Sequence, residues 1–155
     1  MKSRVVFIAM IVAMCLAVGT NGPLAISSEE TTVEQIMHQY VDAYNKKDLA
    51  TFEKICDPNV LFIEEGKKTM GWLDFRDNLK SEWGSIAEGY WDVVKIQVHF
   101  ADKNFAWTTD EGSFKGKMKD GTQVQESLIE SCIFQKKSGA WKLVLTHLSA
   151  VPSQK

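Results

Sequence analysis

The chain has 155 residues, of which 45% are hydrophobic and 25% are charged, and its formal net charge at pH 7 is −2. This composition is typical of one globular domain and excludes a disordered or fibrous chain. The slightly acidic balance, without a cluster of Lys or Arg, argues against nucleic acids and anionic membranes as partners.

Residues 1–19 have the pattern of a secretory signal peptide. Lys2 and Arg4 precede an uncharged apolar run at residues 5–18, which is shorter than the roughly 20 residues that a membrane span needs. Small residues near the end of this segment suit cleavage after Gly19. We therefore expect the leader to be removed, which leaves a periplasmic or secreted protein without a membrane anchor.

Processing as a lipoprotein at Cys15 is the alternative, but Met14 stands before this cysteine, where the lipoprotein motif requires a small residue. Cleavage after Gly19 removes two of the 18 basic residues and none of the 20 acidic ones, so the mature chain carries a net charge of −4. The mature protein is thus expected to be more acidic than the full chain.

Two cysteines remain in the mature chain, Cys56 and Cys132. A disulfide between them would persist in an oxidising compartment, and their separation permits one. Both also lie in apolar stretches, which suits two small buried side chains. The sequence leaves both possibilities open.

The first half of the mature chain is predicted to be mainly helical. A polar linker at residues 20–30 leads to apolar residues at helical spacing from Val33 to Tyr44. Thr31 and Glu34 form a capping box, which places the start of this helix just after Thr31.

A second, shorter helix follows, which Asp48 caps and the Asp-Pro-Asn sequence at residues 57–59 ends. A strand is expected at residues 60–63. Gly71 then opens a third helix. Large apolar side chains recur on one face of this helix, at Trp72, Phe75, Leu79 and Trp83.

The second half changes to the alternating pattern of strands. Apolar and polar residues alternate over 94–100, and turn sequences separate three further stretches at residues 105–109, 124–135 and 141–149. These stretches indicate successive hairpins of one antiparallel sheet. Helices followed by such a meander predict an α+β domain, with the helices packed on one face of a curved sheet.

The stretches that resemble the SnoaL-like branch of the nuclear-transport-factor-2 superfamily are residues 40–49, residues 57–62, Gly71 and residues 141–149. The last stretch is also similar to the final strand of the association domain of calcium/calmodulin-dependent kinase II. The resemblance implies one cone-shaped, cystatin-like α+β domain at residues 31–152, with a tail at 153–155. It also implies a pocket between helices and sheet, and dimerisation through the sheet.

Within this superfamily, the motif of ketosteroid isomerase gives specific candidates for chemistry. The resemblance aligns Tyr40 with a helix tyrosine, Glu64 with the base and Glu130 with a second acid. In that scheme Glu64 removes a proton next to a carbonyl, while Tyr40 and a protonated Glu130 donate hydrogen bonds to the enolate. The chain departs from the motif in two ways: Glu replaces Asp at both acids, and Glu65 and Gly66 follow where the isomerase has a proline.

Each of these candidates also has a structural interpretation. Tyr40 lies on the core stripe of its helix, and Glu64 beside Glu65 fits a solvated loop. Glu130 alternates with apolar residues on the predicted inward face of its strand, which makes it the stronger candidate for a pocket acid.

A pocket inside the cone would be lined largely by aromatic residues. The candidates for ligand binding are Tyr44, Trp72, Phe75, Trp107, Glu130 and His147. His147 shares a predicted strand face with Trp141, whereas His38 and His99 lie on polar faces. The histidines therefore form no metal signature, and the sequence offers no motif for a cofactor or an activated nucleophile.

The leading hypothesis is an exported SnoaL-like domain that binds a small, largely apolar molecule in its cone. One alternative is a cofactor-free isomerase or dehydratase that uses Glu64, Tyr40 and Glu130. Another is a dimeric assembly module with a vestigial pocket. Ile129 and Ile133, on the other face of their strand from Glu130, favour a homodimer.

Overall fold

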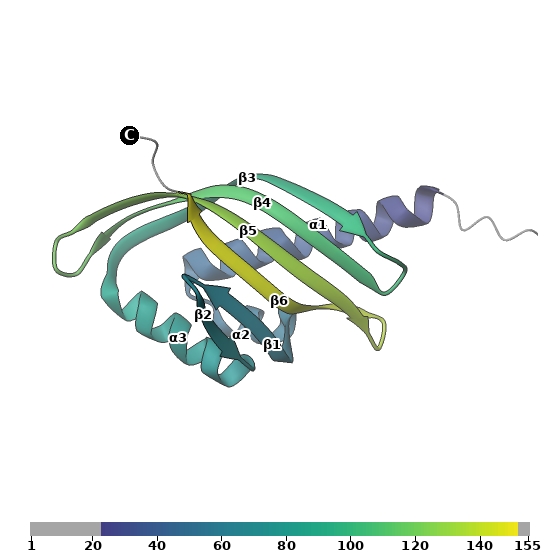
Figure 1. The fold of residues 1–155 in the computed structure, drawn as a ribbon, viewed down its shortest axis with the longest axis horizontal. Helices are drawn as coiled ribbons and strands as arrows, with labels where there is room; N and C mark the ends of the chain where they lie inside the picture. The colour runs from purple at the N-terminus through teal and green to yellow at the C-terminus, as the bar shows by residue number, and fades with distance from the viewer. Residues whose placement is uncertain (1–22, 152–155) are drawn as a thin grey trace, which may run out of the picture.

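The computed structural model describes residues 23–151, with side chains from residue 28 onward. The expected leader and the tail at 153–155 lie outside this range. The described chain contains three helices and six strands (Figure 1). In chain order they are α1 (Pro23–Lys46), α2 (Leu49–Ile55), β1 (Cys56–Glu64), β2 (Lys67–Met70), α3 (Trp72–Ser85), β3 (Ile86–Phe100), β4 (Phe105–Met118), β5 (Gln123–Lys137) and β6 (Ala140–Val151).

The strands form one sheet in the order β2-β1-β6-β5-β4-β3. β1 and β6 run parallel, and the other neighbouring strands are antiparallel. The long strands β3 to β6 arch over the helices (Figure 1). This arrangement confirms the predicted α+β cone, in which helices pack on one face of a curved sheet.

Helix α1 begins at Pro23, earlier than the sequence pattern indicated. The expected linker at residues 20–30 was therefore wrong from Pro23 onward, and the predicted capping box lies inside the helix. Proline suits the first position of a helix, because the N–H that it lacks would have no helical partner there. The Glu29 carboxylate fastens this extension to the sheet, since it accepts hydrogen bonds from Lys136 Nζ and Trp141 Nε1, both at 2.5 Å.

The predicted strands are present, and most are longer than their sequence patterns suggested. β1 starts at Cys56, directly after α2. The short strand β2 was not predicted, because its residues are mainly polar and exposed. Gly71 has a φ of 91°, a left-handed conformation that favours glycine, and it opens α3 as expected.

A register shift in β3 places one side chain on a face that alternation did not predict. The pairing with β4 shifts between Val93 and Lys95. As a result Val94, expected on the inward face, is 78% exposed.

A second irregularity, in β6, changes the orientation of a predicted site residue. Leu143 and Leu145 pair with consecutive residues of β5, so Val144 between them is an extra residue. Beyond this bulge, Thr146 is buried and His147 is exposed. The expectation that His147 faces inward with the start of its strand was therefore wrong.

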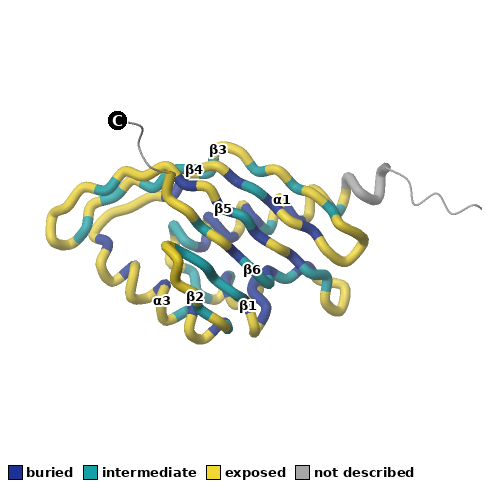
Figure 2. The backbone as a smooth tube through the Cα atoms, viewed as in Figure 1, coloured by how far each residue is buried: buried dark blue, intermediate teal, exposed yellow. Residues whose placement is uncertain are grey.

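The core lies between the helices and the concave face of the sheet, where the buried positions gather (Figure 2). Phe52 of α2 is fully buried and contacts Tyr40 and Phe75 edge-on, with ring centroids 5.0 and 6.0 Å away. Cys56 and Cys132 are both buried and free, which agrees with two small core side chains and not with a bridge. Within residues 23–151, no helix combines the length and the apolar character needed to cross a membrane.

One side chain of α1 pairs with the backbone of β3 as a neighbouring strand would. β3 is an edge strand, so one side of its backbone has no strand partner. Asn45 Nδ2 donates to the carbonyl oxygen of Trp91, and the N–H of Trp91 donates to Asn45 Oδ1, both at 2.8 Å. These two bonds tie the C-terminal part of α1 to the edge of the sheet.

Replacing Asn45 with Ala should lower the free energy of unfolding by about 1–3 kcal/mol, because two part-buried backbone groups lose their partners. Urea unfolding followed by circular dichroism measures this change. Asp42→Ala is the matched control on the same helix, since it removes only an exposed ion pair with Lys46 and should change stability by less than about 1 kcal/mol. Equal effects of the two substitutions would contradict this role of Asn45.

Candidate functional site

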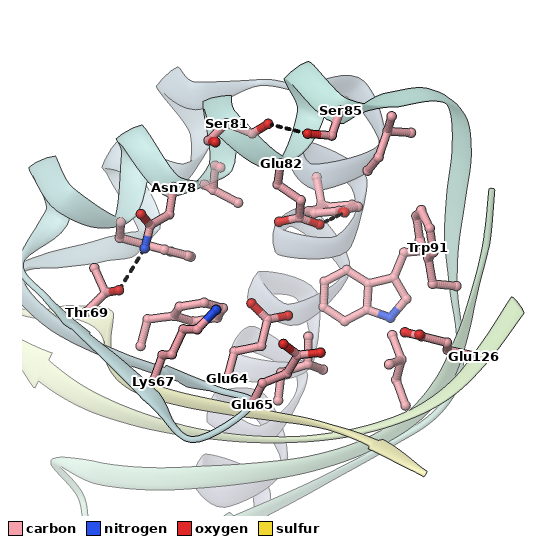
Figure 3. Close-up of a pocket in the computed structure, with 18 of the residues that line it drawn as sticks. Glu64, Glu65, Lys67, Thr69, Asn78, Ser81, Glu82, Ser85, Trp91 and Glu126 are labelled. Carbon is pink, nitrogen blue, oxygen red and sulfur yellow. Dashed lines mark hydrogen bonds between the residues drawn. The ribbon is translucent and has the colours of Figure 1, made fainter. Parts of the chain in front are cut away.

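A cavity of about 570 Å³ lies between the helices and the concave face of the sheet (Figure 3). Its apolar lining consists of Tyr40, Tyr44, Phe62, Phe75, Leu79, Ile86, Trp91, Phe114, Met118, Val124, Leu128 and Leu148. Its polar lining consists of Glu64, Glu65, Lys67, Thr69, Asn78, Ser81, Glu82, Ser85 and Glu126. The volume is in the range of small-molecule sites in proteins.

Aromatic rings in edge-on contact form one wall of this cavity. The Tyr44 ring lies edge-on to Trp91 and Phe114, with centroid separations of 5.4 and 6.4 Å. Phe62 and Phe75 also line the cavity and are stacked, with centroids 4.6 Å apart. Contacts of this kind hold rings in fixed positions, so the apolar surface of the cavity is preformed.

A tight turn places Glu64 inside the cavity. Glu64 is the last residue of β1 and pairs with Lys67 of β2 across the two-residue turn Glu65-Gly66. Both turn residues have positive φ, 48° and 76°, as a hairpin turn of this length requires. The half-buried Glu64 side chain then points into the cavity, where it forms no hydrogen bond or ion pair with a described residue (Figure 3).

The surroundings of Glu64 favour its protonated form. Burial is the main cause, and the negative charges of Glu82, Glu65, Glu130 and Glu126 add to it, so that the pKa of Glu64 is raised to about 7. This carboxyl group therefore changes charge near neutral pH. The sequence-based alternative of a solvated loop charge does not describe it.

Glu82 approaches the cavity from α3 (Figure 3). The Tyr44 hydroxyl donates a hydrogen bond to Glu82 Oε1. Burial raises the pKa of Glu82, and this hydrogen bond partly opposes the rise. Burial and the charge of Glu82 likewise raise the pKa of Tyr44, so the hydroxyl stays a donor.

The structure brings together only some of the residues that the sequence indicated. Tyr40, Tyr44, Glu64 and Phe75 line the cavity. Four other expected ligand-binding residues, Trp72, Trp107, Glu130 and His147, are not among the lining residues.

Trp72, Trp107 and His147 each lie outside the lining for a local structural reason. Trp72 is buried beside Phe75, with centroids 6.2 Å apart. Trp107 lies on the outer face of the sheet, where it stacks on His99 of the neighbouring strand at 5.1 Å. His147 is turned outward by the bulge in β6.

Two acidic residues of the lining were not identified from the sequence, although their positions carried a signal. Glu82 follows Phe75 and Leu79 on the cavity-facing stripe of α3, at a spacing of three residues after Leu79. Glu126 has the same strand parity as Leu128 and Glu130, which face inward. In both cases, an acidic residue on the otherwise apolar, inward-facing side of its element indicated a cavity position.

Tyr40 and Glu130 are linked by a hydrogen bond that lies in the protein core and not inside the cavity. The Tyr40 hydroxyl donates to Glu130 Oε1 at 3.2 Å, and Thr146 Oγ1 donates to the same oxygen at 2.5 Å. Glu130 is only 1% exposed and does not line the cavity. The expectation that Glu130 contacts a ligand was therefore wrong, and the Tyr40 hydroxyl proton is engaged within the protein.

Glu130 shares its buried site with a second acid, Asp110. The two residues are directly opposite each other on β4 and β5, and Asp110 is only 2% exposed. Burial raises the pKa of both carboxyl groups, and each interacts with the other through a side-chain hydrogen bond. Because two neighbouring carboxylates cannot both stay charged in an apolar core, the pair holds a proton at neutral pH.

Cys132 lies beside this pair, and donor atoms of Asp110, Glu130 and Cys132 come within 4.8 Å of one another. This is a grouping that could hold a metal ion. Burial, however, raises the pKa of the Cys132 thiol far above its ordinary value, so the sulfur keeps its proton and is a poor ligand. The cluster therefore fits a shared proton better than a metal.

The acid pair predicts a stability that falls as pH rises. Its raised pKa values mean that the folded protein keeps a proton which the unfolded chain releases above about pH 4. The stabilisation is therefore complete at acid pH and is lost as pH rises through 7 and toward 9. Asp110→Asn cannot ionise, so between pH 7 and 9 it should lose less stability than the wild type, by about 1 kcal/mol or more.

Thermal and urea unfolding from pH 5 to pH 9 test this expectation. Glu111→Gln is the matched control, because its side chain lies next to Asp110 in sequence but is exposed. It should reproduce the pH profile of the wild type. A profile of Asp110→Asn parallel to that of the wild type would contradict the shared proton.

Several solved structures are similar to this chain. A nuclear transport factor 2-like superfamily protein from Salmonella enterica serovar Typhimurium is 18% identical, with a TM-score of 0.76 over 84% of this chain and 96% of that one. The hexachlorocyclohexane dehydrochlorinase LinA-type3 from Novosphingobium barchaimii is 10% identical, with a TM-score of 0.79 over 84% and 92% of the two chains. The association domain of CaMKII from C. elegans is 18% identical, with a TM-score of 0.67 over 81% and 98%.

These structural likenesses establish the fold and leave the activity open. The comparison with curated proteins finds no match. The family model of the SnoaL-like domain matches residues 33–154, which is most of the chain. The chain therefore belongs to the SnoaL-like family.

Proposed function

We propose that this protein binds a small, largely apolar molecule in the cavity between its helices and its sheet. The observation that carries the proposal is a hollow of about 570 Å³ with aromatic walls, which contains the carboxyl group of Glu64, and this group has no partner within residues 28–151. Binding sites for small molecules combine such apolar walls with a few polar groups that orient the ligand. The sequence pattern of the leader adds the proposal that binding takes place outside the cytoplasm.

The geometry gives less support to catalysis by the isomerase scheme. Solved structures of this fold include an enzyme, the hexachlorocyclohexane dehydrochlorinase, and Glu64 has the position that the resemblance gives to the base together with a raised pKa. The scheme also needs two donors that face the ligand. Here the Tyr40 hydroxyl donates to Glu130, and Glu130 lies outside the cavity lining, so the three groups do not converge on one ligand atom.

We also propose a homodimer that forms through the outer face of the sheet. Trp107, Ile129 and Ile133 are 41%, 46% and 38% exposed on that face. Trp107 and Ile133 are direct neighbours across β4 and β5, and Ile133 pairs with Leu145 of β6. A continuous apolar strip over three strands suits a two-fold interface between copies of the chain.

The binding proposal predicts measurable affinity for neutral bicyclic molecules such as 1-naphthol and indole in isothermal titration calorimetry. Ser81→Trp places a large ring in the cavity lining and should weaken binding at least about tenfold, because it fills the space that the ligand occupies. Lys80→Trp is the matched control, since this neighbouring residue of α3 lies outside the lining. Equal binding by both variants would contradict the assignment of the site.

The dimer proposal predicts twice the mass of one mature chain in size-exclusion chromatography with light scattering at micromolar concentration. Ile133→Asp should give the monomer, because a buried unpaired carboxylate opposes association. Glu53→Lys, on the exposed face of α2, changes charge away from the sheet and should leave the dimer intact. A monomeric wild type would rule the dimer out.

A further inference from the structure

Negative charge is concentrated around the cavity. The carboxylates in its lining are Glu64, Glu65, Glu82 and Glu126. Among the described residues of the lining, Lys67 is the one with a positive side chain, and neither Arg nor His is present. With all carboxylates ionised, the lining carries a net charge of −3.

The described part of the chain does not neutralise this charge. Within residues 28–151, Glu64, Glu65 and Glu126 have no ion-pair partner, and Lys67 is not paired with any of them. Glu82 is engaged only by the neutral hydroxyl of Tyr44. The lining carboxylates repel one another, because the charges of Glu82, Glu65 and Glu126 each raise the pKa of Glu64.

The carboxylates lie next to aromatic rings whose faces attract cations. Glu82 is hydrogen-bonded to Tyr44, and the Tyr44 ring packs edge-on against Trp91 and Phe114. A cation near the face of a tyrosine or tryptophan is stabilised by the ring quadrupole, more strongly where water is excluded. Carboxylates and aromatic rings thus favour the same sign of ligand charge.

We infer that the ligand of this cavity is an organic cation: a protonated amine on an apolar or aromatic body. The inference rests on the proposed binding function and specifies its ligand class. Glu64 of the sheet and Glu82 of α3 approach the cavity from opposite sides, so an ammonium group between them donates hydrogen bonds to both (Figure 3). The body of the ligand packs on the aromatic wall, and an anionic ligand is repelled.

Binding of the cation is coupled to the protonation of Glu64. This group faces Glu82 of α3, Tyr44 of α1, Glu126 of β5 and Lys67 of β2, with Glu65 adjacent in the turn. Its pKa of about 7 means that part of the population is protonated at neutral pH, and an ammonium ion favours the ionised form. Amine binding therefore releases a proton below about pH 7 and strengthens as pH rises through 7.

Isothermal titration calorimetry with three indoles of matched size tests the inference: tryptamine, tryptophol and indole-3-propionate. At pH 8 we expect tryptamine to bind at least about tenfold more tightly than tryptophol, and indole-3-propionate to bind most weakly. Tryptamine affinity should rise between pH 6 and pH 8, and tryptophol affinity should stay constant.

Substitutions of single acidic residues test which carboxyl groups cause the preference for tryptamine. Glu64→Gln should weaken tryptamine binding about tenfold and abolish its pH dependence, and it should weaken tryptophol binding by a much smaller factor. Glu82→Gln should weaken tryptamine in the same direction. Glu53→Gln, an exposed acid of α2 outside the lining, is the control for net charge and should have no effect.

The outcomes separate this inference from the proposed function. Equal or tighter binding of tryptophol or indole-3-propionate would overturn the cationic ligand class and leave a small-molecule site in place. Failure of all three indoles, with neutral bicyclic molecules still bound, would overturn it as well. Failure of every molecule in both sets would overturn the binding function and the inference together.

Discussion

The hydrogen bond from the Tyr40 hydroxyl to Glu130 joins helix α1 to the middle of the sheet, and the cavity depends on this joint. The Tyr40 ring contacts Phe52 and Trp91 edge-on, and it also lines the cavity. The Tyr40 side chain thus sets the spacing between helix α1 and the sheet. It packs against the core on one side and forms the floor of the cavity on the other. Asn45 fixes the same helix again at the edge strand, through the backbone of Trp91.

This floor divides the carboxyl groups of the domain into two classes. Below it, Glu130 and Asp110 are closed off from solvent and share a proton, and Glu130 accepts hydrogen bonds from the hydroxyl groups of Tyr40 and Thr146. Above it, Glu64 and Glu82 face an open volume, and Glu64 has no partner among the described residues. Burial raises the pKa in both places, but only the upper pair is placed to exchange its protein environment for a ligand.

The fold could be predicted because its main signals are local. Helical spacing and strand alternation identified the three helices and the four long strands, and the resemblance supplied their arrangement. The failures have separate physical causes. Strand β2 has too few apolar residues to show a pattern, the start of α1 depends on contacts of Glu29 with a distant hairpin, and the bulge at Val144 depends on strand pairing.

The site was less predictable, because alternation assigns a face of the sheet and gives no depth along it. Glu126, Leu128 and Glu130 all point inward from β5. Yet Glu126 is exposed in the cavity lining, Leu128 forms part of its wall, and Glu130 lies below its floor. The curvature of the sheet and the position of α1 decide which of these acids lines the cavity. Both arise from contacts between segments far apart in the chain, which strand alternation does not report. For this reason Glu130, the expected pocket acid, lies in the core, and Glu126 lines the cavity.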